Sequence, residues 1–176
     1  IKVWSSTQSP TVVQKAVARV LGVPQHAVEI ELKRLGGAFG GKEDQATAWA
    51  VMAALATRLT GRPAKICLDR REDITITGKR HPYSTDFKIG LKKDGTIVGF
   101  QAMYYQNSGA VADLSTSILE RTLYHATNSY YIPHVRVTAA ACYTNLHPFT
   151  AFRGFGGPQG MFVIEAAIRL AAETLG

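Results

Sequence analysis

The sequence contains only two cysteines, Cys67 and Cys142. Two thiols cannot form a four-cysteine zinc or iron–sulfur site. Both lie in apolar, strand-like runs, so we expect buried, reduced thiols in a reducing compartment. No apolar run reaches the ~20 residues of a membrane span, and the N-terminal residues lack the charged-then-apolar pattern of a signal peptide. These features indicate a soluble protein of the cytoplasm, with no membrane partner.

The composition suits a globular chain with a core of its own. Its 176 residues are 46% hydrophobic, which predicts one domain or two small subdomains. The net charge is +7, but the basic residues are scattered and form no nucleic-acid motif, so we expect no nucleic-acid partner. A solvated basic surface or an acidic neighbour explains the charge. The chain begins inside a strand-like run and ends after a helical one, so we expect residues 1–176 to be a partial domain, truncated at both ends.

Hydrophobic periodicity predicts strands and helices in mixed order. The expected strands cover residues 1–6, 27–33, 64–68, 83–91, 97–106 and 130–143. The expected helices cover residues 11–21, 43–59, 70–76 and 118–126, with a closing helix from about residue 158. Residues 64–68 read as a short buried strand, and Asp94-Gly95 marks a hairpin turn. This order predicts an α+β fold with mixed strands and helices.

One short phrase occurs twice, as GGAFGGKE at residues 36–43 and as FRGFGGPQ at residues 152–159. Each copy follows an extended segment and leads into a helical pattern. A glycine-rich turn at a helix start presents bare backbone N–H groups, and the missing Cβ atoms let an anionic or flat ligand come close. Two such turns in one chain predict a cofactor cradled between them, as in an oxidoreductase.

The first turn also has an alternative interpretation as a nucleotide-binding P-loop. Gly36, Gly41 and Lys42 match that motif between a strand and a helix, and Asp69 ends a later strand where a magnesium-holding carboxylate would lie. The match fails at Glu43, where a Ser or Thr hydroxyl would bind magnesium and where a carboxylate would repel the phosphates. A P-loop would also leave the second turn unexplained. A purely structural glycine turn is a further alternative.

Four longer stretches of sequence decide between the cofactor site, the P-loop and the structural turn. They are RLGGAFGGKE, TGKRHPYSTDFKIGLKKDGTIVG, LERTLYHATNSYYIPHVR and TAFRGFGGPQGMFVIE. In this order, and over essentially the whole chain, the sequence resembles the molybdenum-binding part of the xanthine dehydrogenases and oxidases. AFRGFGGPQ is specific to the wider molybdenum hydroxylase family, and the FGGKE and ER elements resemble its purine-oxidising branch.

The resemblance implies positions for the cofactor, molybdenum–molybdopterin. Gln8 matches a glutamine whose side chain hydrogen-bonds an oxygen on molybdenum; without the resemblance it would be a polar loop residue. Gly37, Phe39 and Gly40 match the turn whose backbone lies beside the cofactor, and the main chain of Arg153 also borders it. No residue of this chain is expected to ligate the metal, because the family uses the dithiolene of the pterin.

The resemblance also implies the substrate contacts. Glu43 and Arg121 match the polar pair that grips the purine, and Phe155 matches an aromatic that packs against its ring. These enzymes insert a water-derived oxygen at an electron-poor carbon, and a fixed guanidinium stabilises the negative charge that develops on the ring. Taken alone, Glu43 would be an acid at a helix start, Arg121 a surface charge or a partner of Glu120, and Phe155 a core residue.

Other parts of the implied enzyme lie outside these residues. The general base, a glutamate, is expected downstream of Gly176, so no catalytic residue is expected here, and the chain alone should show little or no activity. The implied reaction converts hypoxanthine and xanthine to urate and passes electrons to 2Fe–2S and FAD centres on other domains or subunits. The implied partners are therefore the rest of the molybdenum subunit, these electron-transfer parts and the purine. A relative acting on another N-heterocycle or on an aldehyde stays open.

Overall fold

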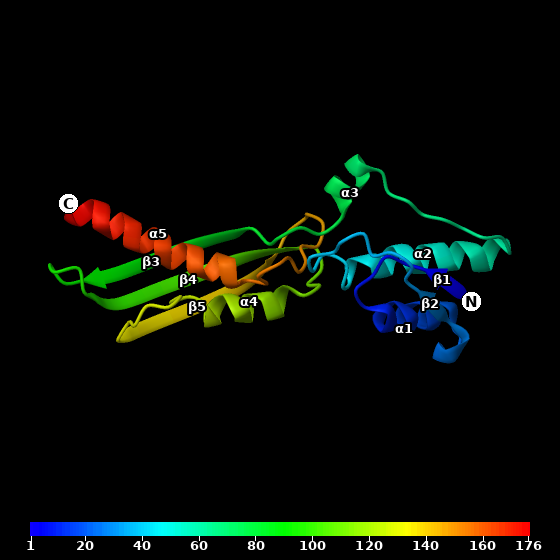
Figure 1. The fold of residues 1–176 in the computed structure, drawn as a ribbon, viewed down its shortest axis with the longest axis horizontal. Coiled ribbons are helices and arrows are strands. Elements are labelled where there is room, and N and C mark those ends of the chain that lie inside the picture. The colour runs from blue at the N-terminus through cyan, green and yellow to red at the C-terminus, as the bar shows by residue number, and fades with distance from the viewer. The chain divides into compact units, whose positions relative to one another are not determined.

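A computed structural model describes all residues from Ile1 to Gly176. The chain forms two compact units (Figure 1). Unit 1 comprises residues 1–79 and 150–152, and unit 2 comprises residues 80–149 and 153–176. Of the two possibilities that the composition left open, the structure thus has two units. None of the helices combines the length and the hydropathy that a membrane span needs.

Unit 1 is built on a β–α–β motif. Its elements are β1 (Lys2–Trp4), α1 (Pro10–Leu21), a 3-10 turn η1 (Gln25–Ala27), β2 (Glu29–Glu31), α2 (Gln45–Thr60) and α3 (Arg70–Ile76). β1 and β2 are parallel, with Val3 opposite Ile30, as expected for strands joined by a crossover helix. Both α1 and α2 contribute to one apolar cluster. Its buried members are Val3, Val13, Val17, Ala18, Val28, Ala50 and Ala54.

Local signals explain where the helices of unit 1 begin and end. Pro10 occupies the first turn of α1, and Gly22 ends the helix in the left-handed conformation with φ of +63°. Asp69 and Glu72 form a reciprocal capping box at the start of α3, with N–H···O distances of 2.7 and 2.9 Å. The predicted short helix at residues 70–76 is confirmed, and Asp69 serves as its N-cap.

The predicted buried strand at residues 64–68 is wrong. These residues are extended but belong to no strand, and only Leu68 among them is even half-buried. Apolar composition cannot make a strand where no neighbouring backbone completes the ladder. The expectation of two buried thiols fails as well, because Cys67 on this segment is exposed. Cys142 is half-buried on β5, which has only one neighbouring strand.

Unit 2 is a three-stranded mixed sheet with two helices. Its elements are β3 (Tyr83–Leu91), β4 (Ile97–Gly109), α4 (Ser115–Tyr124), β5 (His134–Tyr143) and α5 (Gly157–Leu175). The strand order is β3-β4-β5, with β3 antiparallel and β5 parallel to β4. The predicted hairpin is confirmed. Gly95 adopts φ of +83° at its turn, and Asp94 Oδ1 accepts a 3.0 Å hydrogen bond from the Thr96 N–H.

The core of unit 2 lies between one face of this sheet and its helices (Figure 1). Alternate residues of β4 point into it, namely Phe100, Ala102 and Tyr104, and pack against residues of α5. Val163, Ile164 and Ala167 are the α5 members. The predicted α+β fold is confirmed, and the core fixes where α4 and the start of α5 lie.

Candidate functional site

The first glycine turn lies in unit 1 and bends sharply. Gly36, Gly37 and Gly40 have φ of +71°, +86° and +98°, and Phe39 between them has φ of +54°. A bulky residue with positive φ is uncommon and strained, and such residues cluster at functional sites. Phe39 as a whole is 66% exposed. No hydrogen bond within the chain engages the backbone N–H groups of Phe39 and Gly40, so the turn presents free donors to solvent.

Gln8 is hydrogen-bonded to this turn through both its backbone and its side chain. Its backbone N–H donates to the Lys42 carbonyl over 2.8 Å, and its side-chain Oε1 accepts from the Lys42 N–H over 3.1 Å. The exposed side chain therefore holds its Nε2 group away from Lys42, and no other residue of the chain accepts from it. The structure places Gln8 beside the turn that the sequence associates with the cofactor, with an amide donor available.

Lys42 closes the first turn from within. Its Nζ donates to Ser6 Oγ over 2.9 Å and to the Leu35 carbonyl over 2.8 Å. In a P-loop this ammonium reaches the phosphates, whereas here the protein itself engages it. The helix also starts later than the motif requires, because α2 begins at Gln45. The geometry therefore gives the P-loop alternative no support.

Glu43 precedes α2 and has no partner in the chain. It lies before the N-cap residue Asp44. Its side chain is half-buried, and it forms neither an ion pair nor a hydrogen bond with another residue. Its carboxylate oxygens are not among the buried polar atoms that lack a partner, so solvent reaches them. It is therefore available to a ligand, as the predicted substrate contact requires.

Close packing also requires a glycine at residue 40 of the first turn. A Cβ at Gly40 would lie 3.1 Å from both the carbonyl carbon and the oxygen of Ala151, which belongs to the same unit. The neighbouring Thr150 N–H donates to the Lys79 carbonyl over 3.0 Å and holds this segment in place. The segment just before the second turn thus packs directly on the first, and both the close approach and the positive φ exclude a side chain at residue 40.

The second turn, in unit 2, repeats the backbone of the first. Phe155 and Gly156 have φ of +50° and +91°, against +54° and +98° for Phe39 and Gly40. The repeated Phe-Gly-Gly phrase therefore encodes the same left-handed pair of residues twice. Both phenylalanines hold a conformation that their side chains disfavour.

Two glycines after Phe155, Gly156 and Gly160, are needed for helix packing. A Cβ at Gly156 would lie 2.2 Å from the Ile118 carbonyl oxygen, and one at Gly160 would lie 2.5 Å from that of Thr122. At these two positions the missing side chain lets α4 approach the start of α5. A Cβ at Gly157 would meet only ordinary contacts, and the approach of a ligand to the second turn stays a prediction.

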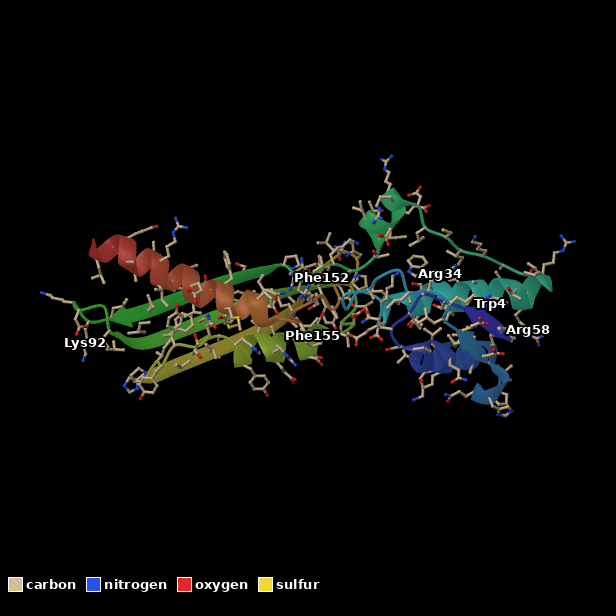
Figure 2. All side chains as sticks on the ribbon, viewed as in Figure 1. Trp4, Arg34, Arg58, Lys92, Phe152 and Phe155 are labelled. Atoms are coloured by element: carbon tan, nitrogen blue, oxygen red, sulfur yellow. The ribbon has the colours of Figure 1, made fainter.

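The same packing brings Arg121 to Phe155. The guanidinium carbon lies 5.8 Å from the centre of the Phe155 ring, within the range of a cation–π contact. Phe155 is labelled in Figure 2, beside α4. Arg121 is exposed and makes no ion pair with Glu120, because successive helical residues do not face each other. The structure therefore unites two of the three predicted substrate contacts.

A buried chain of hydrogen bonds positions α4, and sequence reasoning missed it. Gln106 Nε2 donates to the Tyr83 hydroxyl over 2.8 Å, and that hydroxyl lies 2.9 Å from Thr122 Oγ1. The Thr122 hydroxyl lies 3.1 Å from the Gly156 carbonyl oxygen. Burial raises the pKa of Tyr83, so it stays a neutral donor. Thr122 is the residue next to Arg121, so this chain fixes the part of α4 that carries the guanidinium.

Sequence reasoning also missed Arg80. Its Nη2 donates to the Arg153 carbonyl over 2.6 Å, which fixes the main chain predicted to border the cofactor. The adjacent His81 is buried, and its Nε2 lies 2.8 Å from Ser115 Oγ. Burial lowers the pKa of His81 to about 4, partly opposed by the charge of Asp113. Arg80 and His81 lie in the string TGKRHP, which served only to carry the family resemblance.

The predicted site residues divide between the units. Unit 1 contains Gln8 and the first turn with Glu43, and unit 2 contains Arg121, Arg153 and Phe155. Within each unit the structure brings its members together, and their roles toward cofactor and substrate stay predictions. Residues 1–176 contain no group of three or more histidine, cysteine, aspartate or glutamate side chains placed to bind a metal ion.

Comparisons with known proteins assign the chain to a family. The model of the molybdopterin cofactor-binding domain matches residues 1–176. The chain belongs to this family. The rat xanthine dehydrogenase/oxidase is 46% identical to it over 176 residues, and the xanthine dehydrogenase of Calliphora vicina is 49% identical. Each alignment covers 100% of this chain but 13% of the relative, so the chain spans about an eighth of the length of these proteins.

A solved structure shares the fold of this family member. The aldehyde oxidoreductase of Desulfovibrio gigas superposes with a TM-score of 0.88 at 27% identity. The superposition covers 99% of this chain and 19% of that one. The likeness extends over both units, so the fold described here is that of a segment of this oxidoreductase chain.

The residues present fit the cofactor that the family is named for. The free N–H groups of Phe39 and Gly40 suit an anionic group, as turns with successive exposed amides do. The Gln8 amide adds a side-chain donor beside them.

Proposed function

We propose that this chain is part of the molybdenum-binding portion of a xanthine dehydrogenase-type enzyme that oxidises purines. Identities of 46% and 49% with xanthine dehydrogenases over its whole length support the enzyme class. One observation carries the choice of a purine, namely the Arg121 guanidinium held over the Phe155 ring. A cation fixed beside an aromatic face suits a flat, nitrogen-rich ring that becomes anionic during reaction.

The first glycine turn would hold the cofactor. When bound, the molybdenum cofactor supplies an oxygen derived from water and accepts two electrons from the substrate. The Gln8 amide would donate a hydrogen bond to an oxygen on the metal. The N–H groups of Phe39 and Gly40 would line the cofactor, with the backbone of Gly37 beside it, and the main chain of Arg153 would also border it. None of these groups ligates the metal.

Glu43 and Arg121 would bind the purine. As oxygen adds to a ring carbon, electron density moves onto the ring, and the Arg121 guanidinium would stabilise that charge. The Glu43 carboxyl group would hydrogen-bond ring nitrogens, which would satisfy a side chain that has no partner in the chain. Phe155 would pack against the ring and set its plane. A substrate without ring nitrogens, such as an aldehyde, would use neither polar contact.

The rest of the enzyme would lie outside these residues. We propose that a glutamate elsewhere acts as general base, and that 2Fe–2S and FAD centres on other domains or subunits take the electrons. The partners would be the remainder of the molybdenum subunit and these electron-transfer parts. Two free thiols agree with a cytoplasmic location, where hypoxanthine and xanthine would be converted to urate as a step of purine breakdown.

Arg121→Met in the full-length enzyme tests the substrate assignment. Removing one charge-assisted bond costs roughly 1.5–3 kcal/mol, so kcat/KM for xanthine should fall by about one to two powers of ten. The value for an aromatic aldehyde should change much less. Steady-state kinetics with xanthine, hypoxanthine and the aldehyde measure this, and Glu120→Gln, an exposed neighbour on α4, is the control. Equal losses on purine and aldehyde would contradict the role.

A further inference from the structure

The outer edge of β1 has no partner strand. Ile1 and Ser5 bond to β2, through Glu29 N–H to the Ile1 carbonyl and Ser5 N–H to the Glu31 carbonyl. In a strand the backbone groups of successive residues point to opposite edges. Those of Lys2 and Trp4 therefore point away from β2, and no residue of the chain pairs with them. An unpaired edge of this kind is a template for another strand.

A second unpaired edge lies across a groove from the first. Residues 64–68, part of the extended stretch that Figure 1 shows between α2 and α3, have no strand partners. Only the Ala64 N–H is bonded, to Thr57 Oγ1 over 3.1 Å. The groove between this segment and β1 has a volume of about 790 Å³. Both Trp4 on β1 and Ile66 on the segment line it, and both side chains are substantially exposed. Figure 2 labels Trp4 on β1.

The floor of the groove is a row of small side chains on α2. It consists of Ala46, Ala50, Ala53 and Ala54, with Trp49 and Thr57 beside them. A sheet packs against a helix through the side chains of one face, and alanines leave room for larger apolar residues from above. Lys42 and Lys65 also line the groove and favour an occupant with acidic ends.

We propose that this groove binds one extended polypeptide strand from outside residues 1–176. The strand would pair with β1 on one side and with residues 64–68 on the other, and would place apolar side chains over the alanines of α2 at alternate positions. A polypeptide is the ligand that satisfies two facing rows of backbone donors and acceptors at once. Its source would be the remainder of the molybdenum subunit; that source rests on the proposed function, while the groove does not.

Hydrogen exchange on the 176-residue chain tests the proposal with a defined probe. The probe is the blocked peptide acetyl-Glu-Val-Thr-Val-Thr-Val-Thr-Glu-amide, whose alternation suits the floor and whose ends suit the two lysines. At saturation, exchange at the outward amides of Lys2 and Trp4 and at residues 65–68 should slow at least tenfold. Amides of β3 should be unchanged. A peptide of the same length with proline at two threonine positions lacks two donors and should give no protection.

A pair of matched variants locates the probe. Ala53→Phe fills the floor and should weaken probe binding at least tenfold, whereas Ala48→Phe, on an exposed part of α2 outside the groove, should not. Thermal unfolding followed by circular dichroism shows whether each variant is folded, and the exchange measurement on the unaltered chain does not depend on them. This test requires neither molybdenum nor purine, so it can fail while the enzymatic assignment stands, and the reverse also holds.

Four outcomes would overturn the proposal. The Val–Thr peptide gives no protection, or the proline peptide protects equally well. Residues 65–68 are already protected in the free chain, which would mean that they pair with β1 directly. The chain forms a dimer that Ala53→Phe abolishes, which would make a second copy the occupant.

Discussion

At the scale of the residue, His81 is the buried titratable group whose environment is most clearly defined. Only 3% of its surface is exposed, and Ser115 Oγ lies 2.8 Å from Nε2. Burial disfavours the charged imidazolium, which is why the pKa falls from 6.5 to about 4. Between these two values the unfolded chain binds a proton that the folded chain excludes. Stability therefore falls as pH drops from 6.5 to 4.

His81→Gln should remove this acid sensitivity. The shift corresponds to roughly 3 kcal/mol of unfolding free energy lost by pH 4, so the variant should be less sensitive by about that amount. At pH 7 it should be somewhat less stable than the parent, because it loses the contact with Ser115. Urea unfolding at pH 7 and pH 4.5 measures both effects, with the exposed His134→Gln as control. An unchanged difference between the two pH values would refute the assignment to His81.

Single residues of the site were only partly predictable from the sequence. The turn chemistry of the glycines is local, so the sharp bends at Gly37 and Gly40 could be read directly. Gln8, Arg121 and Phe155 stood out only through the family strings, because an exposed amide, cation or ring carries no local signal. Arg80 was missed, since its bond to the Arg153 carbonyl joins residues far apart in sequence.

At the scale of the element, close glycine packing joins α4 to the start of α5. Gly160 would place a Cβ 2.5 Å from the Thr122 carbonyl oxygen, whereas Gly157 would place one 3.6 Å from the nearest His125 atom. The first distance is a clash with rigid backbone, and the second is ordinary contact. Two glycines three residues apart thus differ in what a methyl group would do.

Gly160→Ala should therefore destabilise the protein, and Gly157→Ala should not. Overpacking against α4 typically costs about 1–3 kcal/mol, while replacing a helical glycine by alanine gains up to ~1 kcal/mol where space allows. The two midpoints in chemical denaturation should shift in opposite directions or differ clearly in size. Similar midpoints for both variants would contradict the close approach of α4.

The elements themselves were largely predictable, and the failures have physical causes. The hairpin, α1, α3 and the closing helix follow from caps, turns and periodicity, all of which are local. The strand expected at residues 27–33 starts only at Glu29, in β2, because Gln25–Ala27 form a 3-10 turn. The strand predicted at residues 64–68 does not form because a strand needs a neighbouring strand to pair with. A sequence pattern does not show whether that neighbouring strand is present.

At the scale of the whole molecule, the 176 residues contain the proposed cofactor and substrate contacts but no expected general base. Positioned proton transfer contributes ~10²–10⁴ in rate, and the chain spans 13% of its relatives. The purified chain, supplied with xanthine and a dye acceptor, should therefore show no turnover above a sample without protein. The full-length enzyme under the same conditions is the positive control. Turnover by the isolated chain would place the base within these residues.

The division into two units could not be predicted from composition or from local pattern. No linker-like stretch marks it, and the chain passes between units at residues 79–80, 149–150 and 152–153. Unit membership depends on contacts between distant segments, such as Gly40 with Ala151. Hydrophobic periodicity does not reveal such contacts. The repeated Phe-Gly-Gly motif did draw attention to the two segments around Gly40 and Ala151.

This interleaving sets an order of events during synthesis on the ribosome. Residues 1–79 of unit 1 emerge well before Thr150–Phe152, which also belong to it. Residues 80–149 must be translated in between, which takes seconds at ~5–20 residues per second. Until then the Lys79 carbonyl lacks its bond from Thr150, and Gly40 lacks Ala151. During synthesis the first glycine turn therefore stays without its packing partner, with Gly40 uncovered, until the ribosome has made Thr150–Phe152.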